Sequence, residues 1–427
     1  MLNKVISSIL LFHAVLQMPP DKSISHRALM LGALARGTSI IHNLSFADDV
    51  RSTQDCLSAL GVDFAVQGEV LTVQGVGVEG LRQPAGALDC GNSGTTMRLL
   101  AGILAGSKMS VTLTGDESLQ RRPMQRVVKP LMAMGGDFST VEGRPPLGIK
   151  GCQLQAVVWR PEVASAQVKS AILLAGLTCA GKTQVAELHP TRDHTERMLK
   201  AFGAKVAYGP AWAEVEGSTI APFEFRVPGD VSAAAFFVVL AACLPQASLR
   251  IEGVGLNPGR TGFLEVLRDM GASVHWEVET EDPEPTGFIE VRGSRLQGFS
   301  IAKDLVPRVI DELPVLAVAA ACAEGRSVVR DATELRFKES DRIRALLGEL
   351  NKLGVKSEEY ADGFAITGGR LSGAVVNSHG DHRLAMALAV AGALASGSTT
   401  IHGAESVAVS YPDFWDDFAH KLRGVQV

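Results

Sequence analysis

The chain has 427 residues, more than one hydrophobic core usually supports, so its length predicts two domains. With 46% hydrophobic residues, 20% charged residues and a formal net charge of -5, the composition excludes a disordered chain and gives no indication of nucleic-acid binding. The six cysteines form no C-x-x-C pair, so we expect free thiols in a reducing, cytoplasmic compartment rather than disulfides or a zinc site.

Residues 1–18 are predicted to form an edge strand. This segment is apolar with a single early lysine, but no small-residue cleavage site of a signal peptide precedes Pro19-Pro20. The apolar run at residues 233–244 is too short to span a membrane. We therefore expect no membrane association.

A polar cluster that opens directly into an Ala/Leu-rich helix recurs six times, at intervals of roughly seventy residues. In the first repeat the pattern predicts a helix at 28–35, a strand at 38–41 and a second helix at 53–60 that ends before Gly61. The sixth repeat breaks off in its second helix, near residues 418–422. The six openings are Asp21-Lys22-Ser23-Ile24-Ser25-His26-Arg27, Cys90-Gly91-Asn92-Ser93-Gly94-Thr95, Ser165-Ala166-Gln167-Val168-Lys169-Ser170, Gly229-Asp230-Val231-Ser232, Ile310-Asp311-Glu312-Leu313-Pro314 and Gly380-Asp381-His382-Arg383.

One stretch, beginning at Gly176 and ending at Lys182-Thr183, matches the G-x-x-x-x-G-K-T expression of a nucleotide-binding P-loop. A P-loop needs a strand before it and a helix after it. Here residues 171–177 read as the end of a helix and 183–188 as a strand, so we interpret the stretch as a helix end and turn.

A helix N-terminus presents unpaired N–H groups and a positive dipole end, so several openings aimed at one space would bind anions. Each opening alone is also explained by simple helix capping. Cations at helix starts, where the dipole disfavours them, favour bound phosphate and carboxylate groups as compensation. The cations in question are Lys22, Arg27, Arg98, Lys169, Lys338, Arg342 and Arg383. Two carboxylates stand in this basic background. Asp311 and Glu339 are candidate general bases, although either could be a helix cap or an ion-pair partner.

The chain resembles members of the EPSP synthase family, the enolpyruvyl transferases of the shikimate pathway. Seven stretches carry the resemblance in family order, from near residue 20 to near 414. They are Asp21 to Ala28, Gly91-Asn92-Ser93-Gly94-Thr95-Thr96-Met97-Arg98, Arg121-Arg122-Pro123-Met124, Ser165 to Ser170, Thr191-Arg192-Asp193-His194-Thr195, Arg336-Phe337-Lys338-Glu339-Ser340-Asp341-Arg342 and Gly380 to Arg383.

The resemblance implies a two-domain inside-out α/β (α+β) barrel of six βαβαββ-type repeats, three in each domain. Residues 20–225 would form one domain, and residues 1–19 with 226–427 the other. The active site would lie in the cleft between the domains. The implied reaction transfers the enolpyruvyl group of phosphoenolpyruvate to the 5-hydroxyl of shikimate 3-phosphate and releases phosphate, with no metal or organic cofactor. A monomer is expected, because the symmetry of the fold is internal.

The resemblance also assigns roles by position. Asp311 would accept the hydroxyl proton, Lys338 would assist nearby, and Glu339 would help to move protons at the methylene carbon. Lys22, which would reach phosphoenolpyruvate, is the third expected catalytic residue. Contacts to shikimate 3-phosphate would come from Lys22, Ser23, Arg27, Ser165, Ala166, Gln167, Arg192, Asp311 and Lys338. Contacts to phosphoenolpyruvate would come from Lys22, Asn92, Gly94, Arg122, Gln167, Arg342 and Arg383.

Two features depart from or refine the pattern. The stretch Val407 to Pro412 lacks a Lys that some family members carry before their aromatic-Pro pair. Gly94 would leave room for the inhibitor glyphosate beside phosphoenolpyruvate, so some sensitivity to glyphosate is expected.

The alternative function in this fold is that of UDP-N-acetylglucosamine enolpyruvyl transferase. That family often carries a reactive Cys before an Arg-Pro, and residues 116–123 contain none, so the sequence favours the EPSP synthase family.

Overall fold

The structure, a computed structural model, describes residues 2–422. The chain divides into two compact units, each with its own hydrophobic core. Unit A comprises Pro20–Pro228 and Asp282–Glu284, and unit B comprises the rest of the described chain. The predicted boundary at residue 225 lies inside a short strand of unit A, three residues before the boundary that the structure shows. The sequence gives no indication that residues 282–284 belong to unit A.

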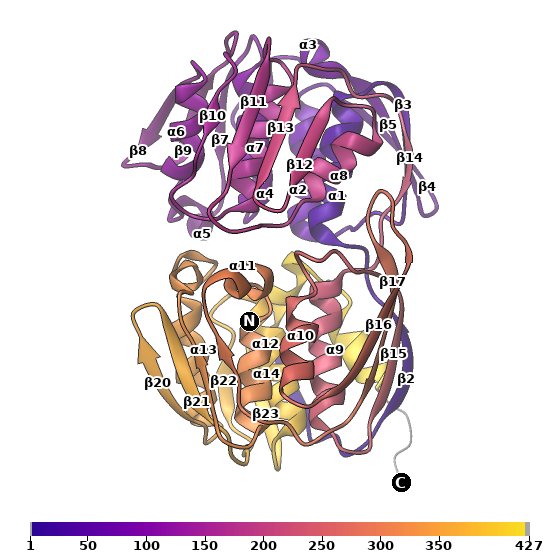
Figure 1. Cartoon of the computed structure of the whole chain (residues 1–427), viewed down its shortest axis with the longest axis vertical. Helices are drawn as coiled ribbons and strands as arrows, with labels where there is room; N and C mark the ends of the chain where they lie inside the picture. Colours follow the sequence, from indigo (N-terminus) through magenta and orange to yellow (C-terminus); the bar gives the residue numbers. More distant parts are fainter. Residues whose placement is uncertain (1, 423–427) are drawn as a thin grey trace. The chain divides into compact units, whose positions relative to one another are not determined.

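Unit A contains three repeats, each with a four-stranded sheet (Figure 1). In every sheet the first pair of strands is parallel and the other pairs are antiparallel. The first sheet has the order β14 (Glu224–Arg226), β3 (Arg36–His42), β5 (Val70–Val76), β4 (Asp63–Gln67). The second has the order β6 (Leu88–Asp89), β7 (Ser110–Thr114), β9 (Arg144–Lys150), β8 (Asp137–Val141). The third has the order β10 (Val158–Trp159), β11 (Lys182–Ala186), β13 (Trp212–Glu216), β12 (Val206–Gly209).

Unit B repeats the scheme, and the N-terminal segment completes it. The fourth sheet has the order β16 (Ser273–Thr280), β17 (Thr286–Arg292), β15 (Ser248–Gly255), β2 (His13–Gln17). The fifth has the order β18 (Ser300–Ile301), β19 (Arg326–Val329), β21 (Gly363–Thr367), β20 (Lys356–Tyr360). The sixth has three strands, β1 (Asn3–Ser7), β23 (Ser398–His402) and β22 (Val375–Asn377). The N-terminal segment therefore forms two strands rather than one, and each lies at the edge of its sheet as predicted.

Each repeat contributes one central helix and a second helix that follows it in the chain. The central helices are α1 (Lys22–Leu34), α4 (Gly94–Ala105) and α7 (Ala166–Gly176) in unit A, and α9 (Val231–Cys243), α12 (Leu313–Cys322) and α14 (His382–Leu394) in unit B. The second helices are α2 (Asp48–Ala59), α6 (Gln125–Ala133), α8 (His194–Ala201), α10 (Gly262–Asp269), α13 (Arg342–Lys352) and α15 (Phe414–His420). Short segments complete the set: α3 (Gly77–Gly80), α5 (Glu117–Gln120), α11 (Val306–Val309) and the 3-10 helices Lys303–Leu305, Thr333–Phe337 and Ala404–Val409.

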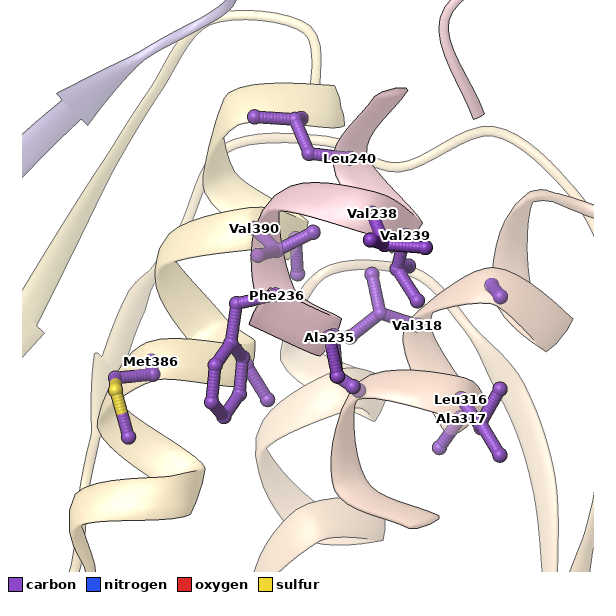
Figure 2. Close-up of a cluster of buried hydrophobic side chains, with 14 of the residues drawn as sticks. Ala235, Phe236, Val238, Val239, Leu240, Leu316, Ala317, Val318, Met386 and Val390 are labelled. Carbon is purple, nitrogen blue, oxygen red and sulfur yellow. The ribbon is translucent and has the colours of Figure 1, made fainter. Parts of the chain in front are cut away.

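Beyond the polar residues at their N-terminal ends, the central helices are apolar on all sides, and a helix with this pattern is stable only when it is buried on all sides. In α9 every residue from Val231 to Ala242 is buried. Figure 2 shows Phe236 and Val239 of this helix among side chains of the neighbouring central helices α12 and α14. In unit A, α4 and α7 approach so closely that a Cβ atom on Gly102 would lie 2.2 Å from the carbonyl oxygen of Ala171. The helices thus form the inside of each unit.

Each of the six predicted openings lies at the N-terminal end of a central helix. The stretch at residues 176–183 runs from the last residue of α7 into the start of β11, so a helix precedes it and a strand follows, the reverse of a P-loop. The fold therefore positions the functional side chains by repeating one device, a short polar turn before a buried helix.

Candidate active site

Helix capping explains part of every opening but one. The side chains of Asp21, Ser93 and Ser165 accept hydrogen bonds from the first turns of α1, α4 and α7. Asp230 and Asp381 do the same for α9 and α14, whereas α12 has no side-chain cap. The cations and carboxylates that follow these caps are the residues available for chemistry.

Lys22 begins α1 and is paired with a carboxylate. Its Nζ lies 2.8 Å from Oδ2 of Asp49, in α2. The carbonyl oxygen of Asp49 accepts a hydrogen bond of 3.4 Å from Thr96 in the first turn of α4. This link brings the openings of the first and second repeats together. Asp49 lies 27 residues from Lys22, and the sequence did not identify it as a partner.

Arg27 is buried and its guanidinium is held on three sides. It donates to Thr195 Oγ1 at 2.7 Å, to Ser170 Oγ at 2.9 Å and to the carbonyl oxygen of Ser23 at 2.8 Å. Burial lowers the pKa of Arg27 to about 10, and the charge of Arg192 also lowers it, while nearby carboxylates oppose the shift. Two guanidiniums close enough to perturb each other are typical of a site for a doubly charged anion.

His26, beside Arg27, is fully enclosed. Its Nδ1 lies 2.6 Å from Thr53 Oγ1. Burial, together with the charges of Lys22 and Arg27, lowers the pKa of this imidazole well below 6.5. His26 is therefore neutral near pH 7 and supports the opening without adding charge.

Asn92 and Arg122 form a second group in unit A. Arg122 donates to Oδ1 of Asn92 at 2.9 Å, and Asn92 donates to Asp116 at 2.7 Å. A Cβ atom on Gly94 would lie 3.1 Å from Nη1 of Arg122 and 3.1 Å from Nη1 of Arg98. A methyl group at residue 94 would thus crowd both guanidiniums.

The third repeat contributes Ser165, Ala166 and Gln167 at the start of α7. Gln167 accepts a hydrogen bond of 2.5 Å from Arg98 and donates to Thr95 at 2.9 Å. Through these contacts the predicted residues of the second and third repeats come together in unit A.

For Lys169 the expectation that a cation at a helix start indicates a bound anion is wrong. Its Nζ lies 2.7 Å from Glu187 and 2.8 Å from Glu196, and all three side chains are almost fully buried. Although burial lowers the pKa of Lys169, the two carboxylates raise it overall. The chain's own glutamates compensate this lysine, so Lys169 is structural. Nothing near it in the sequence indicated these partners.

In unit B, Asp311 lies among three cations. Its carboxylate oxygens are 3.6 Å from Nζ of Lys338, 3.7 Å from Nη1 of Arg342 and 3.8 Å from Nη2 of Arg383. Arg383 also donates to the carbonyl oxygen of Asp311 at 3.0 Å. Lys338 lies between a 3-10 helix and α13 rather than at the start of a helix. The side chain of Asp311 is mostly shielded, with 15% of its surface exposed.

Arg342 is the buried centre of this cluster. It bonds Asp381 through Nε at 2.7 Å and through Nη2 at 3.2 Å, and Nη2 also bonds Glu339. Burial alone would lower the pKa of Arg342, but Asp381 and Glu339 raise it, so the guanidinium is permanently charged. Desolvation lowers the pKa of Lys338, and the charge of Arg342 lowers it as well, against the effect of Asp311. Lys338 therefore gives up a proton more readily than an exposed lysine.

Within residues 2–422, no group of three or more His, Cys, Asp or Glu side chains is arranged to hold a metal ion. Among the same residues, no helix combines the length and apolarity needed to cross a bilayer. All six cysteines are free thiols, as predicted.

Both the sequence and the fold of this chain are similar to those of known proteins. The family model described as EPSP synthase (3-phosphoshikimate 1-carboxyvinyltransferase) matches residues 11–418. A 3-phosphoshikimate 1-carboxyvinyltransferase from Synechococcus sp. (strain JA-3-3Ab) is 52% identical over 405 residues, which are 93% of this chain and 91% of that protein. A solved structure of EPSP synthase from Acinetobacter baumannii is similar with a TM-score of 0.86 and 42% identity, covering 98% of each chain.

The enolpyruvyl transferase NikO from Streptomyces tendae matches with a TM-score of 0.79 and 18% identity, over 98% of this chain and 96% of its own. At this identity the match concerns the fold alone. Together with the EPSP synthase neighbour, it confirms the predicted inside-out α/β architecture of repeated βαβ-type segments.

Proposed function

The chain belongs to the EPSP synthase family, and we propose that the charged clusters of units A and B bind the two substrates of its reaction and move its protons. It is an enzyme of the shikimate pathway, a 3-phosphoshikimate 1-carboxyvinyltransferase by function. The alternative acceptor, UDP-N-acetylglucosamine, is not favoured by these relationships. The assignments to single residues that follow are the proposal.

Shikimate 3-phosphate binds mainly to the openings of the first and third repeats. Arg27 and Arg192 bind the phosphate, since their charges already act on each other and a phosphate would relieve that repulsion. Lys22 and Ser23 bind beside them, and Ser165, Ala166 and Gln167 contact the ring from the start of α7. Lys338 and Asp311 complete the contacts to this substrate.

Phosphoenolpyruvate binds to guanidiniums. Arg122, with Asn92 and Gly94 beside it, and Arg342 and Arg383 provide planar donors suited to carboxylate and phosphate oxygens. Lys22 and Gln167 contact both substrates.

Asp311 acts as the general base. It removes the proton of the 5-hydroxyl as the oxygen attacks C2 of phosphoenolpyruvate, and a proton is added to the methylene carbon C3. Glu339 and Lys22 serve the transfer at C3, and the neighbouring cations stabilise the charge of the tetrahedral intermediate. Loss of a proton from C3 and of phosphate from C2 then restores the double bond. No metal or organic cofactor takes part in these steps.

We further propose that the protein acts as a cytoplasmic monomer, since the pseudo-symmetry of the repeats is internal to the chain. The observation that best supports the catalytic proposal is the position of the Asp311 carboxylate, which lies 3.6 to 3.8 Å from three cations just before the N-terminal end of the buried helix α12.

Two substitutions test whether different arginines bind the two substrates. Arg192→Met should raise the KM for shikimate 3-phosphate by about 100-fold, with a much smaller effect on the KM for phosphoenolpyruvate, because a charge-assisted contact is lost. Arg122→Met should show the reverse pattern. Arg36→Met, which removes an exposed guanidinium of unit A, is the control and should change neither KM. Equal effects of both site variants on both substrates would contradict the proposed division.

A further inference from the structure

Glu312 is a buried carboxylate next to the proposed base, and neither the sequence motifs nor the mechanism above gives it a role. Its side chain is completely shielded, and its Oε1 lies 3.7 Å from Nη1 of Arg383. The other oxygen, Oε2, is buried and has no hydrogen-bond partner among residues 2–422. Burial of a carboxylate with one oxygen unsatisfied costs free energy, so its presence calls for a compensating function.

The carboxylate of Glu312 also accepts a hydrogen bond from a residue of the fourth opening. Ser232, in the first turn of α9, donates its hydroxyl to Oε1 of Glu312. The hydroxyl of Ser232 in turn accepts a hydrogen bond of 2.5 Å from Arg260, whose guanidinium also bonds Asp230 at 3.1 Å. Arg260 is only 1% exposed. The fourth opening, which carries no cation of its own, is therefore connected to the cluster around Asp311.

Arg383 lies between two neighbouring acidic residues. It approaches Oδ2 of Asp311 at 3.8 Å and Oε1 of Glu312 at 3.7 Å, and it donates to the carbonyl oxygen of Asp311. If Glu312 were neutral, the carboxylate of Asp311 would be the stronger remaining attraction for this guanidinium. Arg383 would then move toward the base and away from the position in which it can bind an anion.

We propose that Glu312 is a positioning residue that holds Arg383 in place for phosphoenolpyruvate, with Ser232 and Arg260 fixing the orientation of its carboxylate. The inference rests on the proposed role of Arg383 in binding phosphoenolpyruvate. It assigns the fourth opening to the support of the active site, in addition to its place where the chain returns from unit A to unit B.

The test is steady-state kinetics of Glu312→Gln, which keeps the shape and the acceptor for Ser232 but removes the charge. The KM for phosphoenolpyruvate should rise about tenfold, while kcat and the KM for shikimate 3-phosphate change less than about threefold, because a misplaced binding group weakens one substrate selectively. Ser232→Ala should shift the same KM in the same direction by a smaller factor. Glu349→Gln, which neutralises another buried carboxylate of unit B paired with Lys352 and His379, should leave all three constants unchanged.

A double-mutant cycle with Arg383→Lys separates positioning from a general loss of structure. If Glu312 acts through Arg383, Glu312→Gln should raise the KM for phosphoenolpyruvate less than about twofold when Arg383 is already replaced. The inference is overturned if the full effect persists in that background. It is also overturned if Glu312→Gln lowers the KM for phosphoenolpyruvate, since the carboxylate would then only repel the substrate.

Two further results keep this inference distinct from the proposed function. If Arg383→Lys alone leaves the KM for phosphoenolpyruvate unchanged, the assignment of Arg383 is at fault, and the role of Glu312 falls with it. If Glu312→Gln does not fold, as judged by circular dichroism, Ser232→Ala alone decides the matter: an unchanged KM for phosphoenolpyruvate in that variant overturns the inference, and a selective increase supports it.

Discussion

Replacing Asp311 with Asn removes the proposed base while preserving the size of the side chain and the backbone contact to Arg383. The three cations around it lie 3.6, 3.7 and 3.8 Å from the carboxylate. With an effective dielectric constant of about 20, each such pair has a gross Coulomb attraction of about 4.5 kcal/mol. These attractions stabilise a carboxylate at this position, and a carboxylate is the form of the side chain that can accept a proton.

The effect on turnover follows from the chemistry. A positioned general base contributes about 100-fold to 10,000-fold to the rate, or roughly 2.7 to 5.4 kcal/mol of activation free energy. We therefore expect kcat of Asp311→Asn to fall by at least about 100-fold. The KM of either substrate should change less than about fivefold, because the cations that bind them remain.

The assay is phosphate release from phosphoenolpyruvate at saturating shikimate 3-phosphate, with Tm measured in parallel. Asp269→Asn, at an exposed position of α10, is the control and should retain full activity. A kcat of Asp311→Asn within about threefold of the unmodified chain would refute the assignment, since no general base of this kind contributes so little.

Three further substitutions test unit A. Gly94→Ala should raise the glyphosate concentration needed for half-inhibition by about tenfold, because its methyl group would lie 3.1 Å from Arg122; unchanged inhibition at fixed phosphoenolpyruvate would contradict this. The lowered pKa of His26 means that the unfolded chain binds a proton below about pH 6.5 that the folded chain does not. The unfolding free energy should therefore fall as the pH decreases from about 6.5, by up to about 1.4 kcal/mol per pH unit, and His26→Gln should reduce this slope in denaturant titrations. Lys169→Met leaves two buried glutamates unpaired and should cost about 3 to 5 kcal/mol, lowering Tm by roughly 10 °C. The exposed Lys182→Met should shift Tm by less than about 2 °C, and an equal shift for both lysines would oppose the argument.

Local patterns in the sequence predicted the repeats well, because each relies on neighbouring residues. The opening at Asp21 and the helix that follows it are examples: the cap, the apolar run and the closing Gly37 all lie within 17 residues. The helix is longer than predicted, since it includes Lys22 and the polar residues after it. A polar opening reads as a loop in the sequence, but its side chains cap and begin the helix.

Partners distant along the chain were beyond such reasoning. Lys22 and Lys169 carried similar signals, a cation at the start of a helix. The structure pairs Lys22 with one carboxylate near other candidate residues and encloses Lys169 between two glutamates. Only the tertiary fold brings Glu187 and Glu196 to Lys169. The sequence therefore identified the charged groups but not which of them are already neutralised.

Glu312 illustrates the same limit at the proposed base. In the sequence it is the residue after Asp311 and before an apolar helix, where an acidic residue is commonplace. Its significance depends on Ser232 and Arg383, which lie 80 and 71 residues away along the chain. No local pattern relates these three residues. In unit B they come together because each lies at the N-terminal end of a central helix, where Glu312 contacts both Ser232 and Arg383.

The most direct test of the account is phosphate release from phosphoenolpyruvate with three alternatives offered in parallel. Release should occur with shikimate 3-phosphate as acceptor, and the organic product should carry the enolpyruvyl group on the 5-oxygen. Release with UDP-N-acetylglucosamine instead, or phosphate produced from ATP alone without transfer to shikimate 3-phosphate, would contradict it.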